Sequence, residues 1–436
     1  MDNTKIITVT SPKELKKMKK LVLFTNIFPY SILNTEHVFI SPELKFLAKY
    51  FDQITIIPEN VGDEMVCIQN ENIKIDTTYA SGIKIKTSKL QLLKQLRHFF
   101  TPIGILSVLS DLKRMKNIKH FAIHIITIDR IFQFQKWLKN FILKEDVDLH
   151  NTLFYTYWFC EATSALALFS NKNIKIITRA HGFDIYDERV TYRSMYFRNK
   201  TLKHILSVFT ASVSGQHYLQ LKYPRYSSKI EVQYLGAVKK NNGFTKTNTD
   251  LQITFFTSAR AEPVKRLTLS ARLIMELAKQ IPEYDVRWIH VGDGKEMDMV
   301  KSICQSQKIP NLKIEFKGKL SNEQVHDIYI NETIDWAILT SSSEGGCPIS
   351  IVESLSYGVP VIATSVGGIP EIVTENNGIL LSKDPSESEF IAKMTTILQN
   401  KELYASLKKQ AYADYLNKFN AEKNHEYFVK KIIQFL

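Results

Sequence analysis

Two glutamates, Glu344 and Glu353, offer the clearest chemistry in the sequence, within the stretch DWAILTSSSEGGCPISIVESLSYGVPVIATSVGGIPEIV at residues 335–373. A carboxylate that accepts two hydroxyl hydrogen bonds can hold a sugar ring. Glu353 falls on the margin of the apolar face of a predicted helix, from which it can point into a crevice. An isolated pair of this kind is more often a loop charge and a solvated helix residue, so the rest of the chain decides between the two interpretations.

The segments around the two glutamates predict a βαβ unit. An apolar run at 336–340 is typical of a buried parallel strand, and Pro348 suits the first turn of a helix that Gly358 would end. A second strand is expected at 359–364. The Gly-Gly pair at 345–346 therefore lies at the carboxyl end of a strand and the amino end of a helix. Unpaired N–H groups and the helix dipole favour a phosphate there.

Two cations occupy another loop of the same kind. Arg260 and Lys265 lie between a predicted strand at 253–259 and a predicted helix at 267–280. Such a loop lies at the ligand edge of a parallel sheet, where a guanidinium fork and an ammonium group suit a diphosphate. On a basic protein the pair alone would be unremarkable.

His181 is the candidate from the first half of the chain. It follows a predicted strand at 175–178 and stands next to Gly182, two residues after Arg179. A core histidine and a functional histidine are both open interpretations, and the position at the ligand end of a strand favours the second.

The pattern of elements predicts two doubly wound α/β domains. Strands expected at 21–28, 54–58 and 152–158 alternate with helices and open the first sheet, with a loop expected at 29–40 after the first strand. A polar segment rich in Asn, Thr and Lys at 236–250 lacks periodicity and is interpreted as the linker. We therefore expect domains at 1–240 and 241–418, followed by a last amphipathic helix at 419–436.

Composition limits the class of protein. With 44% hydrophobic and 23% charged residues the chain is expected to be globular, and its polar, Lys-rich first 20 residues do not predict a secretory signal. The four cysteines show no CxxC spacing and indicate neither a zinc site nor a disulfide framework; they are Cys67, Cys160, Cys304 and Cys347. A reducing cytoplasm fits this usage.

Positive charge is concentrated in one segment. The net charge is +13, and residues 81–150 hold thirteen Lys and Arg against five Asp and Glu, interleaved with apolar residues. Amphipathic helices with a cationic rim could contact an anionic membrane or an anionic lipid-linked substrate. Helices with solvated lysines are an equal alternative, and nucleic acid is a weaker one because no binding module accompanies the charge.

Four motifs in order resemble the GT-B retaining glycosyltransferases of family 4, in particular enzymes of bacterial surface-polysaccharide synthesis. The motifs are RAHGFDIY, SARAEPVKR, WIHVGDG and SSSEGGCPISIVESLSYGVPVIATSVGGIPEIV, and the likeness covers residues 21–435. The resemblance implies two Rossmann-like domains that face a cleft, with the C-terminal helix crossing back to the first domain.

The resemblance also implies a role for each candidate residue. Arg260 and Lys265 would hold the pyrophosphate of a sugar nucleotide, and Glu353 would take the ribose hydroxyls. Glu344, with the backbone of Gly345 and Gly346, would contact the donor sugar, which His181 would approach from the other domain. Lys319 lies in the family's base-binding loop.

The implied reaction transfers a hexose with retention from a UDP- or GDP-sugar to a lipid-linked or oligosaccharide acceptor, in capsule, O-antigen or exopolysaccharide synthesis. Two cations and a helix terminus can stabilise the departing diphosphate, so we expect no metal and no further cofactor. The pair Asp146 and Asp148 forms a DxD motif away from the predicted pocket and is interpreted as structural. The implied location is the cytoplasm, with peripheral contact at the inner face of the plasma membrane.

Two departures and two alternatives accompany the resemblance. Glu344 and Glu353 enclose eight residues where the family usually has seven, which predicts a bulged loop. The first-domain loop NIFPYSILNTEH lacks the family's glycine pair, so the acceptor and phosphate contacts of that loop in the family are not carried over to this chain. The same fold also accommodates nucleotide-sugar epimerases and phosphorylases, and a non-catalytic membrane-surface protein is the third candidate.

Overall fold

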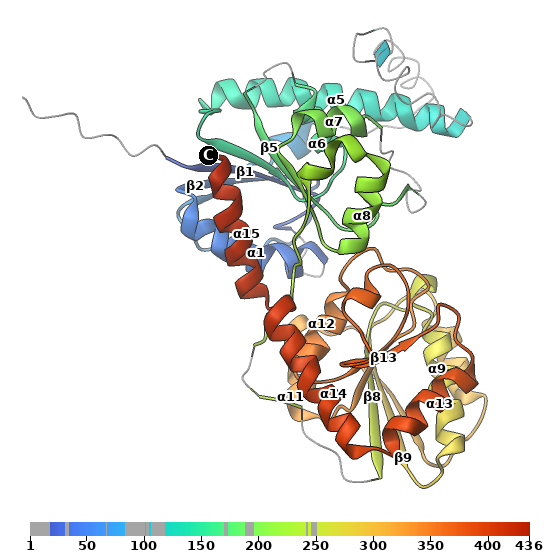
Figure 1. Cartoon of the computed structure of the whole chain (residues 1–436). Helices are drawn as coiled ribbons and strands as arrows, with labels where there is room; N and C mark the ends of the chain where they lie inside the picture. Colours follow the sequence, from blue (N-terminus) through green and yellow to red (C-terminus); the bar gives the residue numbers. More distant parts are fainter. Residues whose placement is uncertain are drawn as a thin grey trace, which may run out of the picture.

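The computed structural model describes residues 18–30, 35–66, 68–82, 101, 104–105, 118–169, 173–187, 196–240, 243–245 and 251–436. These residues form two α/β units, each built on a parallel sheet, one above the other in Figure 1. The two-domain Rossmann-like architecture predicted from the sequence is confirmed.

The first sheet has seven strands in the order β3-β2-β1-β4-β5-β6-β7. The strands are β1 (Lys20–Thr25), β2 (Gln53–Pro58), β3 (Ile73–Ile75), β4 (Thr152–Thr156), β5 (Lys175–Ala180), β6 (Ser207–Thr210) and β7 (Ile230–Val232). Its helices are α1 (Thr35–Tyr50), α2 (Thr78–Gly82), α5 (Ile118–Lys144), α6 (Glu161–Ala167), α7 (Arg198–His204) and α8 (Val213–Lys222).

The second sheet has six strands in the order β10-β9-β8-β11-β12-β13. The strands are β8 (Gln252–Ser258), β9 (Asp285–Val291), β10 (Leu312–Phe316), β11 (Trp336–Leu339), β12 (Val361–Thr364) and β13 (Gly378–Leu381). Its helices are α9 (Leu267–Gln280), α10 (Met297–Gln305), α11 (Asn322–Asn331), α12 (Ile349–Ser356), α13 (Glu387–Leu398) and α14 (Lys401–Asp414).

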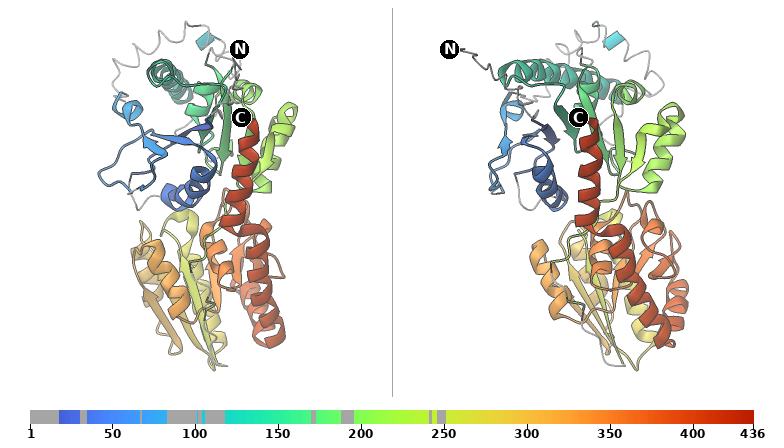
Figure 2. Two further views of the ribbon diagram at one scale, coloured as in Figure 1. Left: turned by 90° about the vertical axis from the view of Figure 1, so that its left-hand side faces the viewer. Right: turned by 60° about the vertical axis from the view of Figure 1, so that its left-hand side comes forward.

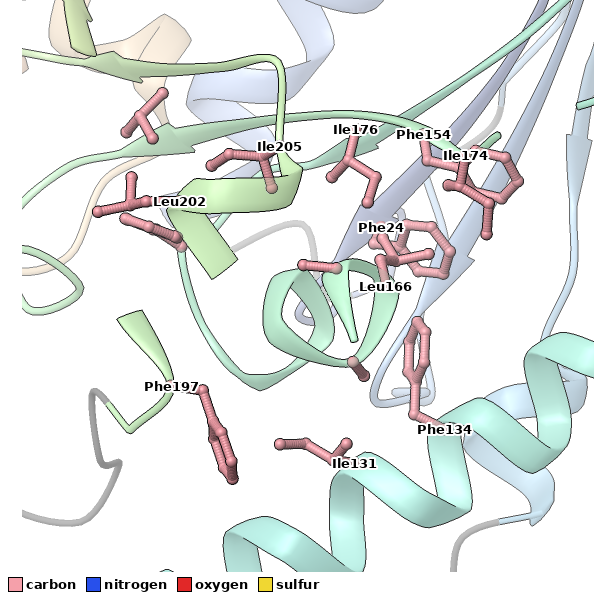
Figure 3. Packing of buried hydrophobic residues seen from close by; sticks show 14 of the residues in the cluster. Phe24, Ile131, Phe134, Phe154, Leu166, Ile174, Ile176, Phe197, Leu202 and Ile205 are labelled. Carbon is pink, nitrogen blue, oxygen red and sulfur yellow. The ribbon is translucent and has the colours of Figure 1, made fainter. Parts of the chain in front are cut away.

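Both faces of the first sheet are covered, as its continuous apolar strands require. Phe134 of α5 and Leu166 of α6 pack toward Phe24 and Phe154 on one face (Figure 3). Helix α1 covers the other face together with the last helix of the chain. Parallel strands buried on both faces leave only their ends open, so the carboxyl ends of the strands position the site.

The C-terminal helix α15 (Ala421–Ile432) crosses back to the first domain. Figure 2 shows it running up from the second domain, and Phe428, Val429 and Ile432 belong to the buried cluster beside α1. The crossing predicted for the last helix is confirmed. The first sheet ends at Val232 and the second sheet begins at Gln252, on either side of the predicted linker. The domain boundaries predicted at 240 and 418 stay predictions.

One predicted boundary was wrong. The sequence indicates a loop as far as residue 40, but α1 begins at Thr35 and contains Pro42 inside the helix. The Glu36 carboxylate accepts three hydrogen bonds from the main-chain N–H groups of residues 26–28, which fixes the first turn of α1 close to the end of β1. These hydrogen bonds stabilise a helix start at Thr35, although proline is found more often in the first turn of a helix than at an interior position such as that of Pro42.

The basic segment at 81–150 is only partly described. Helix α5 confirms an amphipathic helix at 118–144, whereas residues 83–100, 102–103 and 106–117 lie outside the described residues. None of the helices in the described ranges is both long and apolar enough to cross a bilayer.

Candidate active site

The predicted donor residues Lys265 and Glu344 form an ion pair at the edge of the second sheet. Lys265 follows β8 and Glu344 follows β11, and these strands are neighbours in the sheet. The Lys265 Nζ lies 2.5 Å from Glu344 Oε1, which also accepts from Ser341 Oγ at 2.6 Å. The two side chains are 20% and 12% exposed, so the pair is only partly open to solvent. The structure thus brings the predicted phosphate cation and the predicted sugar carboxylate together.

Arg266 ties the two loops to each other, a role that the sequence did not suggest. Its guanidinium donates to the carbonyl oxygens of Thr340 and Ser341, at 2.7 and 3.0 Å. Arg260 lies exposed on the same loop as Lys265, and no hydrogen bond or ion pair within the described part of the chain engages its side chain. Arg260 therefore stands at the predicted edge but apart from the ion pair.

The glycine loop after β11 packs against the first domain. A Cβ atom at Gly346 would lie 2.8 Å from the carbonyl oxygen of His181 and 3.4 Å from the Cβ of Ala211. A Cβ atom at Gly367 would lie 1.6 Å from the carbonyl oxygen of Glu344. Gly345, beside Glu344, is buried. Only glycines allow this approach, so His181 and the Gly-Gly loop meet across the two domains.

The extra residue between the glutamates is accommodated before the helix. Pro348 is the N-cap of α12 with φ −65°, and the helix begins at Ile349. The loop that carries Glu344 therefore ends before α12 begins, and Glu353 lies in the second turn of the helix. Gly358 ends the helical segment with φ +70°, as predicted from the sequence.

His181 is held by its backbone directly after β5. Its N–H donates to Asp184 Oδ1 at 2.7 Å, and the N–H groups of Gly182 and Phe159 donate to the same carboxylate at 2.9 and 3.0 Å. Burial alone would raise the pKa of the Asp184 carboxyl, but its interactions with His181 and the backbone amides lower it below its usual value. An ionised Asp184 thus fixes the turn that carries His181.

The His181 ring is packed among aromatic rings, and both of its nitrogens are buried. Its centroid lies 4.5 Å from that of Trp158 and 4.9 Å from that of Tyr157. Within the described chain neither ring nitrogen has a hydrogen-bond partner. The nearest carboxylate oxygen to Nδ1, Asp184 Oδ2, lies 3.8 Å away, which is too far for a hydrogen bond. Ring nitrogens held in place without a partner can accept or donate to a ligand.

Trp158 and Glu36 complete the support of His181, and sequence reasoning missed both. Trp158 Nε1 donates to Glu36, the carboxylate that also binds the N–H groups of residues 26–28. Glu36 is 1% exposed. Glu36 therefore occupies the position in front of the main-chain N–H groups after β1 and fixes the indole against the His181 ring.

Glu353 is buried in a polar setting. The side chain is 6% exposed, and its Oε1 accepts from Asn322 Nδ2 at 2.8 Å. Burial raises the pKa of the carboxyl to about 7, while the Asn322 hydrogen bond and the charge of Lys240 act in the opposite direction. Near neutral pH this group is poised between acid and carboxylate.

Glu353 lines a cavity of about 810 Å³ between the two domains. The predicted base-binding residue Lys319 lines it too, together with Asn322 and Lys240, and α1 of the first domain contributes His37, Ser41 and Lys45. Arg260, Lys265, Glu344 and His181 do not line this cavity. The predicted residues therefore fall into two groups, one in this cavity and one outside it. Helix α12 connects them, because it follows the loop of Glu344 and contains Glu353.

The DxD pair has a local structural role. Asp148 accepts from the His150 N–H at 3.0 Å and from Asn151 Nδ2 at 2.6 Å, in the turn before β4. Among the residues that the structure describes, no cluster of three or more His, Cys, Asp or Glu could hold a metal ion.

Comparison with known proteins connects the second domain to one family. Residues 239–414 match the family described as "Glycosyl transferases group 1". N-acetyl-alpha-D-glucosaminyl L-malate synthase of Bacillus anthracis is 26% identical over 35% of this chain and 38% of its own length. Sulfoquinovosyl transferase SQD2 of Arabidopsis thaliana is 27% identical over 30% of this chain and 25% of its own length. The chain thus spans less than half of these curated relatives.

Solved structures match almost the whole chain in fold. A glycosyltransferase from Rickettsia africae has a TM-score of 0.63 at 16% identity, covering 96% of this chain and 98% of its own. The lipopolysaccharide outer core galactosyltransferase WaaB has a TM-score of 0.65 at 14% identity, covering 96% and 100%. HepE of Anabaena, solved with UDP and glucose, has a TM-score of 0.59 at 16% identity, covering 95% and 99%. The chain has the GT-B fold, and its residues 239–414 carry the sequence pattern of the glycosyl transferases group 1.

Proposed function

We propose that the protein is a glycosyltransferase that moves a sugar from a nucleotide sugar to an acceptor hydroxyl. The observation that carries the proposal is the approach of His181 to Gly346, beside the Lys265–Glu344 pair. The main chain of His181 in one domain thereby meets the glycine loop of the other domain, which follows directly after the carboxylate that binds Lys265. The match of residues 239–414 to glycosyl transferases group 1 supports the same function.

The Lys265–Glu344 pair gives the donor a defined way to bind. A diphosphate takes the place of Glu344 as the partner of Lys265, with Arg260 as the second cation on the same loop. Glu344 is then free to accept hydroxyl groups of the donor sugar. The negative charge that develops on the departing diphosphate faces Lys265, Arg260 and the amino end of α12, so no metal is required in this proposal.

The transfer proceeds with retention in this proposal. The bond between the anomeric carbon and the diphosphate oxygen breaks, and the acceptor oxygen forms the new bond on the same face. The acceptor proton passes to the departing phosphate oxygen. His181, whose ring nitrogens have no partner within the described chain, binds the donor sugar from the first domain.

The cavity beside Glu353 suits the nucleoside. Glu353 accepts the ribose hydroxyls, and Lys319 lies on the side of the base. The donor is a UDP- or GDP-sugar, a proposal supported by the UDP bound to HepE, which shares the fold.

The acceptor is a lipid-linked saccharide or an oligosaccharide of capsule, O-antigen or exopolysaccharide synthesis, which makes the enzyme a hexosyltransferase of family 4. The structural neighbour WaaB, named for the lipopolysaccharide outer core, supports an acceptor of this class. The basic segment at 81–150 would contact an anionic membrane surface peripherally from the cytoplasm. That contact is expected to weaken with salt.

A panel of UDP- and GDP-sugars tests the proposal by thermal shift, followed by hydrolysis of the donor that stabilises most. We expect Lys265→Ala and Glu353→Ala to lower hydrolysis roughly 100-fold or more, the scale of losing one group that stabilises developing charge. Lys301→Ala removes an exposed lysine of α10 and serves as the control. Full activity of both site variants would overturn the assignment, and formation of an epimer without acceptor would identify an epimerase instead.

A further inference from the structure

Glu371 of the second domain binds the amino end of a first-domain helix. It ends the short 3₁₀ turn Ile369–Glu371 that follows β12. Its carboxylate accepts from the N–H groups of Val213 and Ser214, both at 2.6 Å, and from Ser214 Oγ at 2.5 Å. The Tyr234 hydroxyl donates to the same carboxylate at 3.1 Å. One side chain thus gathers four donors from the other domain.

The start of α8 does not satisfy these donors by itself. Val213 and Ser214 are the first two residues of α8, whose N–H groups have no acceptor within the helix. The N-cap residue Ser212 accepts through its side chain from the Gly215 N–H, at 3.1 Å. A carboxylate is the preferred partner at a helix amino end because the helix dipole is positive there. The contact is therefore matched in both hydrogen bonding and charge.

The same contact surrounds the meeting point of His181 and Gly346. Ser214 Oγ also lies 3.2 Å from the carbonyl oxygen of Gly367, so it can donate there as well. A Cβ atom at Gly368 would lie 2.6 Å from the carbonyl oxygen of Gly346 and 3.3 Å from Ser212 Cβ. The turn that carries Glu371, the Gly-Gly loop and the start of α8 thus pack as one layer.

We propose that Glu371 is a positioning residue that latches the two domains together and so holds His181 against the Gly345–Gly346 loop. The catalytic part of this inference rests on the proposed function, and Glu371 acts through the domain contact rather than on the donor. Small errors in the relative position of reacting groups are costly, since a shift of about 1 Å can slow an enzyme roughly 100-fold. Domain closure of this kind assembles a site from two halves.

Hydrogen exchange measures the latch directly in the full chain. Glu371 accepts from the amides of Val213 and Ser214 in the wild-type protein, so Glu371→Ala is expected to expose both in the peptide over residues 211–218. Glu371→Gln keeps one acceptor oxygen and is expected to give partial protection. Glu375→Gln, an exposed neighbour on the same domain, is the matched control and leaves the protection unchanged. Unchanged protection in Glu371→Ala would overturn the proposal.

Turnover separates positioning from simple loss of structure. The proposed UDP ligands Lys265, Arg260 and Glu353 belong to the second domain, although α1 of the first domain also lines the nucleoside cavity. The affinity for UDP is therefore expected to fall much less than kcat for donor hydrolysis, which falls roughly 10- to 100-fold. An unchanged kcat, or a parallel loss of UDP affinity, would count against a positioning role. If Glu371→Ala does not fold, Glu371→Gln decides by the same two readouts. If the wild-type protein hydrolyses no nucleotide sugar, the proposed function fails, while hydrogen exchange still decides on the latch.

Discussion

The Cβ position of Gly346 lies 2.8 Å from the carbonyl oxygen of His181, closer than a side-chain carbon can approach a main-chain oxygen. This nearest atom belongs to the main chain directly after β5 and cannot turn away as a flexible side chain could. Gly346→Ala therefore has to displace the glycine loop or the main chain of His181 at the proposed site. We expect kcat for donor hydrolysis to fall roughly 100-fold, the scale of a displacement of about 1 Å.

Gly243→Ala is the control for this substitution. Gly243 has open space around its Cβ position and no positive φ, so the same chemical change is free of strain there. UDP affinity measured by calorimetry is expected to fall much less than turnover in Gly346→Ala, because the proposed UDP ligands Lys265, Arg260 and Glu353 belong to the second domain. Normal turnover in Gly346→Ala would contradict a functional contact between His181 and the glycine loop.

Trp158 supports the His181 ring through its hydrogen bond to Glu36. Trp158→Phe keeps an aromatic ring but removes the Nε1–H donor, so the ring beside His181 loses its anchor. We expect a loss of about 1.5–3 kcal/mol in stability, the usual value of a hydrogen bond to a charged group. The expected fall in donor hydrolysis is about tenfold, because the His181 ring is then less firmly positioned.

Trp137 provides a matched comparison on α5, where its Nε1 donates to Thr78 Oγ1 at 2.9 Å. Trp137→Phe removes a hydrogen bond to a neutral hydroxyl and is expected to lose about 0.5–1.5 kcal/mol of stability and no turnover once the protein is folded. Equal losses of turnover in the two variants would show that Trp158 acts only through stability.

Glu353 makes donor binding dependent on pH. Burial raises the pKa of its carboxyl to about 7, and ribose hydroxyls donate to the ionised form. Below pH 7 a proton has to leave before the donor binds, so affinity rises with pH. Between pH 6 and pH 8 the ionised fraction grows about tenfold, and the association constant should follow it.

A nucleotide sugar is the right ligand for this titration, since its diphosphate carries no group that ionises near neutrality. Calorimetry at several pH values gives the slope, and Glu353→Gln is expected to remove it and to bind more weakly at pH 8. A slope that persists in Glu353→Gln would assign the proton to another group.

Local patterns predicted the elements of the second domain well. Helix α9 covers 267–280, as expected, because its apolar residues repeat with the helical period and Gln280 precedes a break at Pro282. The placement of Glu353 on the margin of α12 was equally local. Its elevated pKa was not predictable, because it results from burial in the folded protein, which the hydrogen bond from Asn322 of another helix only partly offsets.

Contacts between distant segments had no signal in the sequence. Glu36 and Trp158 are separated by 122 positions, and Glu371 binds residues that precede it by 157 and 158 positions. Glu36 also shows why the start of α1 was misplaced. In the sequence, a glutamate that binds main-chain N–H groups of a distant loop cannot be distinguished from an ordinary acidic residue in the first turn of a helix. Such roles emerge only when the topology brings the segments together.

A buried ion pair behind His181 anchors both α1 and α15. Glu43 of α1 accepts from Arg179 Nη2 at 2.6 Å and from the Tyr155 hydroxyl at 2.7 Å, and both charged side chains are 1% exposed. Burial alone would raise the pKa of Glu43, but the Arg179 guanidinium dominates and lowers it to about 2. His425 of α15 lies 3.4 Å from the same carboxylate, so this cluster joins the C-terminal helix to the strand that carries His181.

Glu43→Gln leaves the Arg179 charge buried without its partner, which typically costs about 3–5 kcal/mol. For a domain of this size the expected fall in Tm is roughly 6–20 °C, measured by scanning calorimetry. Acid should act in the same direction: a carboxyl with a lowered pKa contributes stability that is present above about 4.5 and is lost as pH falls toward 2. Glu64→Gln changes an exposed glutamate and should leave Tm within about 1 °C, in keeping with the small effects of surface substitutions. Equal Tm values for the two variants would show that the buried pair contributes nothing net to the attachment of α15.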